Sequence, residues 1–320
     1  MNSPRGAGSL VKNTLLLHKS LVTLSFFLIQ LLNSVQYGLL LFLCAAGLTL
    51  VFGIMGVINL AHGSMYMLGA YLAFSLAEGL GSLWLALPVG VLLAFAFGAL
   101  LEKLVIGRLY NRPHLHQVLL TYGLILVFDE LRSLVWGDDV HGVAVPKALE
   151  ASLPLTDTLS YPVYRLFMSG ACLVVALALA WVLLRTRLGM TIRAGSVNGD
   201  MVQSLGIDIG RVRRLVFAAG VALAAFAGML AAPASSVFPG MGNQVLIVCF
   251  VVVVIGGIGS VKGALVAALV VGLADTFGKV ATLQIGGVGV LPELSGLGIY
   301  LLMAAVLVWR PQGLFGRGVP

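Results

Sequence analysis

Long apolar runs separated by short polar segments fill most of the chain. A helix that crosses a bilayer needs about 20 predominantly apolar residues. Two of the runs, Val245–Gly257 and Gly263–Phe277, are short, and they are either separate spans or helices broken inside the membrane. The pattern predicts an all-α, polytopic membrane protein of eight to ten transmembrane helices, some of them broken or kinked. The longer runs are Val35–Met55, Leu60–Leu76, Leu83–Val105, Val118–Val135, Leu166–Leu184, Leu215–Ala232 and Val288–Trp309.

The first 32 residues combine basic positions with a shorter apolar run. Arg5, Lys12 and Lys19 precede Leu21–Leu32, an order similar to the charged and hydrophobic regions of a signal peptide. No small-x-small cleavage site follows, and apolar sequence soon resumes. We therefore interpret residues 1–32 as a retained N-terminal segment. Its apolar run Leu21–Leu32 is too short to cross the bilayer unaided and is expected to form an interfacial helix.

Composition agrees with a membrane protein. Of the 320 residues, 60% are hydrophobic and 10% are charged, and the mean hydropathy is +1.06, whereas soluble domains carry about 25% charged residues. A soluble chain cannot bury so much apolar surface. The cysteines lie in apolar runs without metal-type spacing, so we interpret them as small buried hydrophobes. They are Cys44, Cys172 and Cys249.

The net charge is +7. It comes from basic residues that cluster in particular loops, so membrane topology explains it better than a nucleic-acid surface. Basic residues gather in residues 107–117, in Arg185–Arg214 and in the C-terminal tail, and the positive-inside rule places all three in the cytoplasm. The segment Asp129–Arg165 is acidic and contains prolines, which predicts an ordered external loop. A single topology places all the basic segments in the cytoplasm and the acidic loop outside, and it puts the C-terminus in the cytoplasm.

Polar residues interrupt the apolar sequence between Gly53 and Tyr71. Polar groups at membrane depth are costly unless they meet partners or water, and the glycines here would allow a kink or a break. Transporters build paths from such broken helices. The alternative is a helix–helix contact in which Asn59 and His62 satisfy each other or a backbone carbonyl. The candidate path residues of this segment are Asn59, His62, Gly63, Ser64, Tyr66 and Tyr71.

A second glycine-rich break occupies residues 256–260. It is not a phosphate loop, because that motif needs Gly-Lys followed by Ser or Thr, and here Val261 precedes Lys262. Asp275 further along lies either within the membrane or near its external end, with Lys279 four residues on as its partner. We add to the candidate path Gly256, Gly257, Gly259 and Ser260.

The polar segment Arg185–Arg214 separates two spans. Met201, Val202 and Leu205 share one face of a short predicted helix, and Gly206 suits its C-terminal end. Such a helix either inserts into a groove on a cytoplasmic partner or lies on anionic headgroups. Its small apolar face favours the partner, so residues 185–214 are the candidate cytoplasmic coupling loop.

Three motifs in order carry a family resemblance. They are GVINLAHGSMYMLGAYLA from Gly56, RLGMTIRA with LGIDIGRVR from Arg187, and VVVVIGGIGSVKGALVAALVVGLAD from Val251. Together they resemble the permeases of branched-chain amino acid ABC importers, in particular the LivH-like half. The resemblance runs from Val35 to the Pro-Gln-Gly tail that begins at Pro311.

The resemblance implies a single transmembrane permease domain over residues 1–320, in the bacterial cytoplasmic (inner) membrane. The implied partners are a second, LivM-like permease, two cytosolic ATPase subunits, an external or periplasmic substrate-binding protein and membrane lipid. ATP and Mg²⁺ would be held by the ATPases, so no cofactor, metal or catalytic residue is expected in this chain. Alternating access would move branched-chain or other hydrophobic amino acids, or a related small polar solute, inward.

Two sets of site residues follow from this reading. The resemblance places Arg193, Asp200, Leu205, Gly206 and Ile207, beside Met201 and Val202, in the ATPase groove. Many relatives have Glu where this chain has Ser64, which removes an acid from the expected path. The acidic external loop is the candidate dock for the binding protein, through Asp138, Asp139, Glu150 and Asp157.

Two functions of other classes compete with this interpretation. An ion-gradient-driven secondary transporter or channel would need no ATPase partner, but it would need a coupling-ion site or a continuous pore. The spans offer Asp275 alone and no cluster of carboxylates. An intramembrane enzyme would need a nucleophile–base or metal pair, and the apolar runs contain none at a recognisable spacing.

Overall fold

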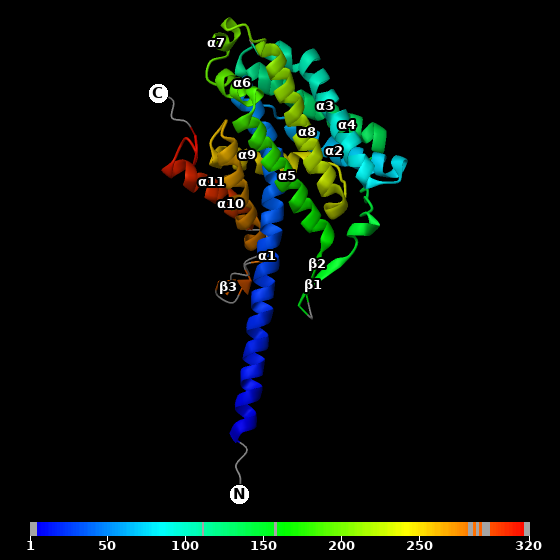
Figure 1. The fold of residues 1–320 in the computed structure, drawn as a ribbon, viewed down its shortest axis with the longest axis vertical. Coiled ribbons are helices and arrows are strands. Elements are labelled where there is room, and N and C mark those ends of the chain that lie inside the picture. Colours follow the sequence, from blue (N-terminus) through cyan, green and yellow to red (C-terminus); the bar gives the residue numbers. More distant parts are fainter. Residues whose placement is uncertain are drawn as a thin grey trace.

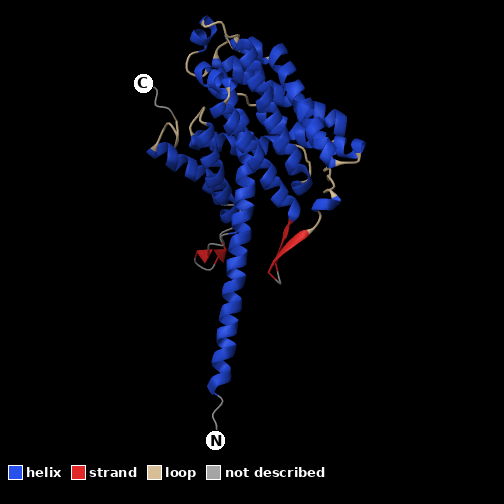
Figure 2. Cartoon of the chain, viewed as in Figure 1, coloured by secondary structure: helices blue, strands red, loops and turns tan. Residues whose placement is uncertain are grey.

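The computed structural model consists almost entirely of helices packed side by side (Figure 1). It describes residues 5–110, 112–156, 159–280, 284–285, 288–289 and 295–316, and their side chains over residues 25–110, 112–154, 160–280 and 296–316. These residues form eleven α-helices, two short 3-10 helices and two small antiparallel strand pairs (Figure 2). The predicted helical fold class is confirmed, and the strand pairs are additions that the sequence pattern did not predict.

The elements follow one another with short connections. In chain order they are α1 Arg5–Met55, α2 His62–Leu80, α3 Leu83–Leu104, η1 Ile106–Leu109, α4 His114–Trp136, η2 Lys147–Leu149, β1 Ser152–Thr156, β2 Leu159–Pro162, α5 Val163–Arg185, α6 Arg187–Gly195, α7 Gly199–Ser204, α8 Ile209–Ser235, α9 Met241–Gly256, α10 Val261–Val280, β3 Gln284–Ile285, β4 Val288–Gly289 and α11 Ser295–Trp309.

Helix α1 is continuous over 51 residues, about 77 Å at 1.5 Å per residue. Its N-terminal part extends beyond the helical body (Figure 1). The sequence pattern divided this region into an interfacial segment over residues 1–32 and a span from Val35, but the described residues show no break there. No proline interrupts the helix between Arg5 and Met55, so nothing in the backbone chemistry forces an end. Placement of its first turns at a membrane interface stays a prediction.

Helix α8 is the central helix of the body and packs against α1, α2 and α3. Small residues allow this close approach, as is usual between membrane helices. Gly220 faces Gly47 of α1, and Gly228 lies against the backbone carbonyl of Tyr66 in α2. Gly98 of α3 would place a Cβ within 3.0 Å of the α8 backbone. The glycines therefore set the distances between the central helix and its neighbours.

Five helices are long and apolar enough to cross a membrane within the described residues. Helices α9 and α11 are apolar but shorter, and α2 and α4 form where two further spans are predicted. A multi-pass membrane protein is thus supported, whereas the count of eight to ten spans is not confirmed. The last predicted span, Val288–Trp309, begins too early, because Val288 pairs with Ile285 in a strand and α11 starts at Ser295.

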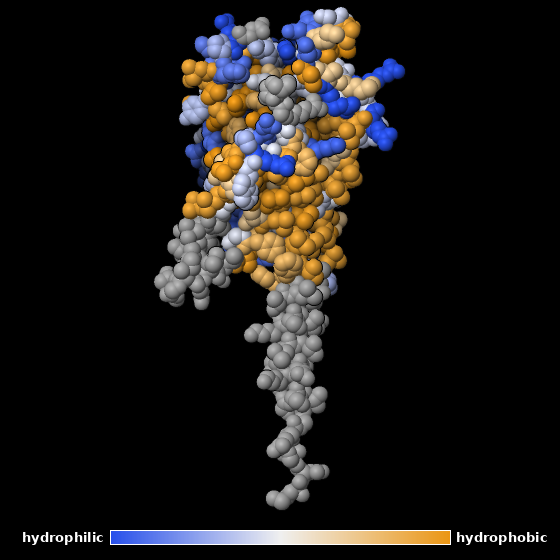
Figure 3. Space-filling model, turned by 90° about the vertical axis from the view of Figure 1, so that its left-hand side faces the viewer, coloured by the Kyte–Doolittle hydropathy of each residue, from blue (hydrophilic) through white to orange (hydrophobic). Residues whose placement is uncertain are grey.

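The surface separates into an apolar band and a hydrophilic end. Figure 3 shows hydrophilic residues gathered at the end of the body that carries α7, with a continuous apolar surface below them. We call this the basic end; it contains α6, α7, η1 and residues 310–316. The β1–β2 hairpin lies toward the opposite end of the body (Figure 1). We call this hairpin and the loop of residues 137–151 the acidic end.

The contact between α2 and α8 generates a stability prediction. Gly228→Leu would drive a side chain into the Tyr66 carbonyl, and overpacking of this kind costs about 1–3 kcal/mol. We expect a lower thermal unfolding temperature in detergent. Gly79→Leu is the matched control, because a Cβ at Gly79 meets nothing within 4 Å. An equal effect of the two changes would contradict the packing role of Gly228.

Candidate translocation and coupling sites

The chain breaks between α1 and α2, as the glycines predict. Gly56 has a φ of 65°, and α2 begins only at His62. The His62 ring nitrogen Nε2 lies 2.9 Å from the backbone carbonyl oxygen of Cys44, which is eleven residues before the end of α1. Residues 56–61 therefore fold back along α1, and α2 starts inside the body. Asn59 closes this turn, because its side-chain oxygen accepts a hydrogen bond from the backbone N–H of Ala61 at 3.1 Å.

The predicted path residues of this segment all lie inside the subunit. The contact between His62 and a backbone carbonyl matches the packing alternative for this motif. Several buried polar atoms nevertheless have no hydrogen-bond partner within the described residues, among them Asn59 Nδ2, His62 Nδ1 and the Tyr71 hydroxyl. Such atoms need water or a rearrangement. The buried members of the set are Asn59, His62, Gly63, Ser64, Tyr66 and Tyr71.

The second predicted break separates α9 from α10. Gly257 and Gly259 have φ values of 92° and 81°, a region that side chains with a Cβ rarely adopt. Ser260 accepts the N–H of Gly263 at 3.0 Å and so caps the start of α10. The Cβ position of Gly53 lies 3.4 Å from the Cα of Gly259. The structure therefore brings the two glycine-rich motifs together, although about 200 positions separate them along the chain.

The C-terminal tail closes the second break, which the sequence motifs did not indicate. The backbone N–H groups of Leu314 and Phe315 donate to the carbonyl oxygens of Ile255 and Gly256 at 2.8 and 3.1 Å. These carbonyls end α9 and have no helical partner. Gly313, with a φ of 78°, lets the tail lie directly on the backbone of Gly257.

The candidate coupling loop is not extended but folds into short capped helices. Thr186 caps α6 by accepting the N–H of Gly189 at 3.2 Å, and Asn198 caps α7 by accepting that of Met201 at 2.9 Å. Asp208 caps α8 by accepting that of Arg211 at 3.1 Å. Each cap satisfies a backbone donor that the first turn of a helix leaves free.

The candidate coupling residues divide into an outer and an inner set. Met201 and Leu205 are 60% and 71% exposed, whereas Val202 is 5% exposed. Val202 packs instead with Ile54 of α1 and Ile209 of α8. The prediction that Met201, Val202 and Leu205 share one outward face is therefore wrong for Val202, because a helix of two turns must also attach to the body. The remaining members are the exposed Asp200, Gly206 and Ile207 and the half-buried Arg193.

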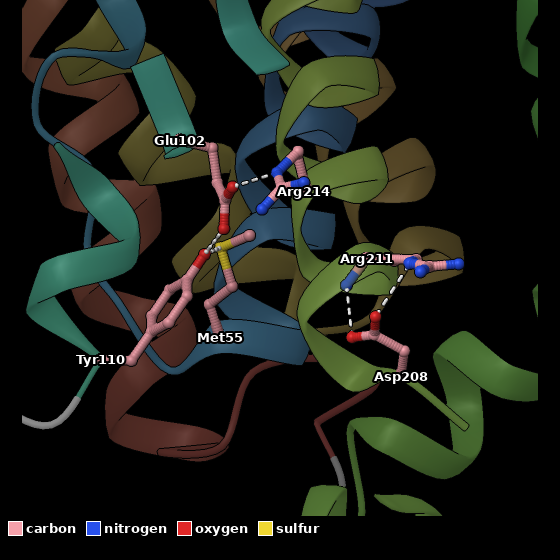
Figure 4. Close-up of polar contacts among 6 residues, drawn as sticks. All are labelled: Met55, Glu102, Tyr110, Asp208, Arg211 and Arg214. Atoms are coloured by element: carbon pink, nitrogen blue, oxygen red, sulfur yellow. Dashed lines mark hydrogen bonds and ion pairs between the residues drawn. The ribbon is translucent and has the colours of Figure 1, made fainter. Parts of the chain in front are cut away.

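A buried carboxylate also lies at the basic end, and no motif pointed to it. Glu102 in the last turn of α3 accepts a hydrogen bond from the Tyr110 hydroxyl at 2.6 Å and pairs with Arg214 Nε at 3.0 Å (Figure 4). Burial, and then the bond to Glu102, raise the pKa of the Tyr110 phenol, so it stays a donor. The available signal was a charged residue at the end of an otherwise apolar run.

At the acidic end the predicted docking residues differ in their contacts. Asp138 pairs with the buried Arg132 at 2.6 Å, and this hydrogen bond, followed by one from Ser133, lowers the pKa of Asp138. Asp139 and Glu150 are exposed. Asp157 lies outside the described residues.

Asp275 has the partner that its sequence spacing suggests. Its carboxylate is buried and lies 2.6 Å from Lys279 Nζ, four residues on in α10. The prediction of an i, i+4 pair is confirmed.

Comparison with known proteins identifies the family. Residues 30–307 match the model of the branched-chain amino acid transport system permease component. The chain belongs to this family. It is 29% identical to the permease protein LivH of Escherichia coli over 306 residues, which cover 91% of this chain and 96% of LivH. BraD of Pseudomonas aeruginosa is 30% identical over 307 residues, with the same coverage.

A second branch of the family is also similar. The permease protein LivM of Escherichia coli is 29% identical over 297 residues, which cover 84% of this chain and 66% of LivM. The match to the family model contains both glycine breaks and the whole coupling loop. These regions therefore lie within the shared permease fold and outside any addition peculiar to this chain.

The contact between the tail and the α9–α10 break can be tested in this permease. Gly313→Ala would put a Cβ 2.5 Å from the Gly257 nitrogen at a strained φ, at a cost of about 1–3 kcal/mol. We expect the amides of Leu314 and Phe315 to exchange hydrogen about tenfold faster or more. Gly296→Ala is the control, since a Cβ there meets nothing within 4 Å. If these amides are equally protected in Gly313→Ala, the contact of the tail with Gly257 does not hold the break in place.

Proposed function

We propose that this chain is the membrane-spanning permease subunit of an ATP-driven ABC importer for branched-chain amino acids or a related small solute. The observation that carries the proposal is α7 with its C-cap residue, because Met201 in the helix and Leu205 at its end are exposed at the basic end. Exposed apolar residues at i and i+4 on a short helix suit a groove on a soluble partner. The names of LivH and BraD, both permease proteins of high-affinity branched-chain amino acid transport systems, support the substrate class.

The partners and the location follow from the same proposal. Two ATPase subunits with ATP and Mg²⁺ bind at the basic end, and a LivM-like permease completes the membrane part. The similarity of LivM to this chain supports pairing of two related subunits. The basic end, which carries both α7 and the C-terminal tail, lies in the cytoplasm of a bacterial cell. An external binding protein supplies the substrate at the acidic end.

The mechanism is alternating access driven by closure of the ATPases. Closure displaces α7, and the cluster of Val202, Ile54 and Ile209 passes the displacement to α1 and α8. Because α8 also packs on α2 and α3, its movement reaches the fold-back segment of residues 56–61. Few charges lie inside the spans to hold a zwitterion, so the binding protein supplies most of the selectivity.

A pull-down from gently solubilised membranes tests the attachment of the ATPases. Met201→Asp with Leu205→Asp places two charges in the proposed groove, and we expect ATPase recovery to fall about tenfold or more, as for interface hot spots. Val140→Asp is the matched control, because Val140 is equally exposed, at 67%, but lies at the acidic end. The wild-type chain recovered alone, together with uptake driven by an ion gradient, would instead support a secondary transporter.

The acidic end generates a separate prediction on docking. Asp139→Lys with Glu150→Lys leaves the pair of Asp138 and Arg132 intact but reverses two exposed charges. We expect binding of the purified substrate-binding protein to weaken by about tenfold at low ionic strength, and less at high salt, because steering by exposed charges is screened. Asp200→Lys at the basic end is the control. Equal affinity of reversed and wild-type chains would exclude this loop as the dock.

A further inference from the structure

Glu102 is a charged side chain in an apolar environment at the basic end. It is 3% exposed and lies in the last turn of α3. Its two oxygens have separate partners, since Oε1 accepts from Tyr110 at 2.6 Å and Oε2 meets Arg214 Nε at 3.0 Å. A carboxylate that is buried in this way needs such partners, because an unpaired charge there would be costly.

The partners of Glu102 come from the other elements of the basic end. Arg214 is in the second turn of α8, and Tyr110 directly follows η1. The Tyr110 hydroxyl also lies 3.7 Å from the sulfur of Met55, the last residue of α1. The guanidinium of Arg213 covers the Tyr110 ring at 4.9 Å. The Glu102 carboxylate thus joins the end of α3 to the beginning of α8, and Tyr110 extends the contact to the end of α1 (Figure 4).

The first turns of α8 also pack against α6 and α7, through a different face of the helix. Ile209 and Val212 belong to the apolar cluster that holds Val202 of α7, whereas Arg213 and Arg214 face the Glu102 group. The beginning of α8 is therefore attached to α7 by apolar contacts and to α3 by an ion pair. Contacts from both α7 and Glu102 therefore meet on the first two turns of α8.

Stability alone does not account for this arrangement. Only the Glu102 side of this pair is buried, because the Arg214 side chain is 42% exposed. Such a pair adds little stability, since desolvation of the carboxylate offsets the attraction between the charges. Beyond apolar packing, these hydrogen bonds fix the orientation of α3 relative to α8. The Arg214 Nε–H and the Tyr110 hydroxyl each donate to a different oxygen of Glu102.

We propose that Glu102 is a positioning residue that transmits movement of the coupling loop to α3 and to the end of α1. This inference rests on the proposed function as an importer. Loss of the Glu102 group leaves the ATPases bound and active but weakens the link between hydrolysis and movement of the substrate. The ratio of transport to ATP hydrolysis is therefore the quantity that Glu102 controls.

The test uses the assembled transporter in liposomes, with its companion permease, its ATPases and its binding protein, and radiolabelled leucine as the probe. Glu102→Gln and Arg214→Gln each remove the ion pair, and we expect the ratio of leucine transported to ATP hydrolysed to fall about threefold or more. Lys103→Gln is the matched control. Lys103 is the exposed neighbour of Glu102 in α3 and lies outside the candidate coupling loop, so its loss should leave the ratio unchanged.

Tyr110→Phe is a second variant for the case in which Glu102→Gln does not fold. It removes one hydroxyl and keeps the ring under Arg213, so it retains the packing of Tyr110. We expect the same direction of change, with ATPase subunits recovered at the wild-type level. An unchanged ratio in Tyr110→Phe and in any Glu102→Gln complex that assembles would overturn the inference. A wild-type complex that couples ATP hydrolysis to uptake of neither leucine nor a related small solute would instead overturn the proposed function.

Discussion

The lack of water inside a membrane is the constraint on which this structure depends. Polar groups that lie inside the helical body must therefore find partners within the chain. The His62 ring nitrogen Nε2 lies 2.9 Å from the carbonyl oxygen of Cys44 in α1. The last carbonyls of α9 accept from the N–H groups of the tail residues Leu314 and Phe315. Distant parts of the chain thus supply partners that water would supply in a soluble protein.

Close helix packing is the second consequence of the same environment. Apolar side chains gain little by leaving lipid for protein, so membrane helices associate through contact of small residues. Helix α8 follows this rule on the sides that face α1 and α2, through Gly220 and Gly228. A helix packed so closely moves with its neighbours. That property makes α8 suited to carry movement from the coupling loop into the membrane, and the ion pair of Arg214 with Glu102 extends the connection to α3.

The two ends of the molecule have different chemistry, which matches their proposed partners. At the basic end, capped short helices hold apolar residues outward, and most of the charge there is arginine. At the acidic end, Arg132 and Asp138 fix the loop that follows α4, and the neighbouring carboxylate of Asp139 is exposed. A soluble ATPase and a soluble binding protein need such distinct surfaces, because each must recognise only one side of the membrane.

The sequence by itself determined the helical class, the positions of most helices and both glycine breaks, and it offered the pairing of Asp275 with Lys279 as one of two alternatives. Each follows from local chemistry: apolar run length, glycine backbone freedom and i, i+4 spacing. Only the tertiary structure decided that Val202 points inward, that Gly53 meets Gly259, and that the tail closes the α9–α10 break. The same holds for Glu102, whose partners lie 8 and 112 residues away. Contacts of this range depend on how whole helices pack, and no local pattern in the chain encodes that.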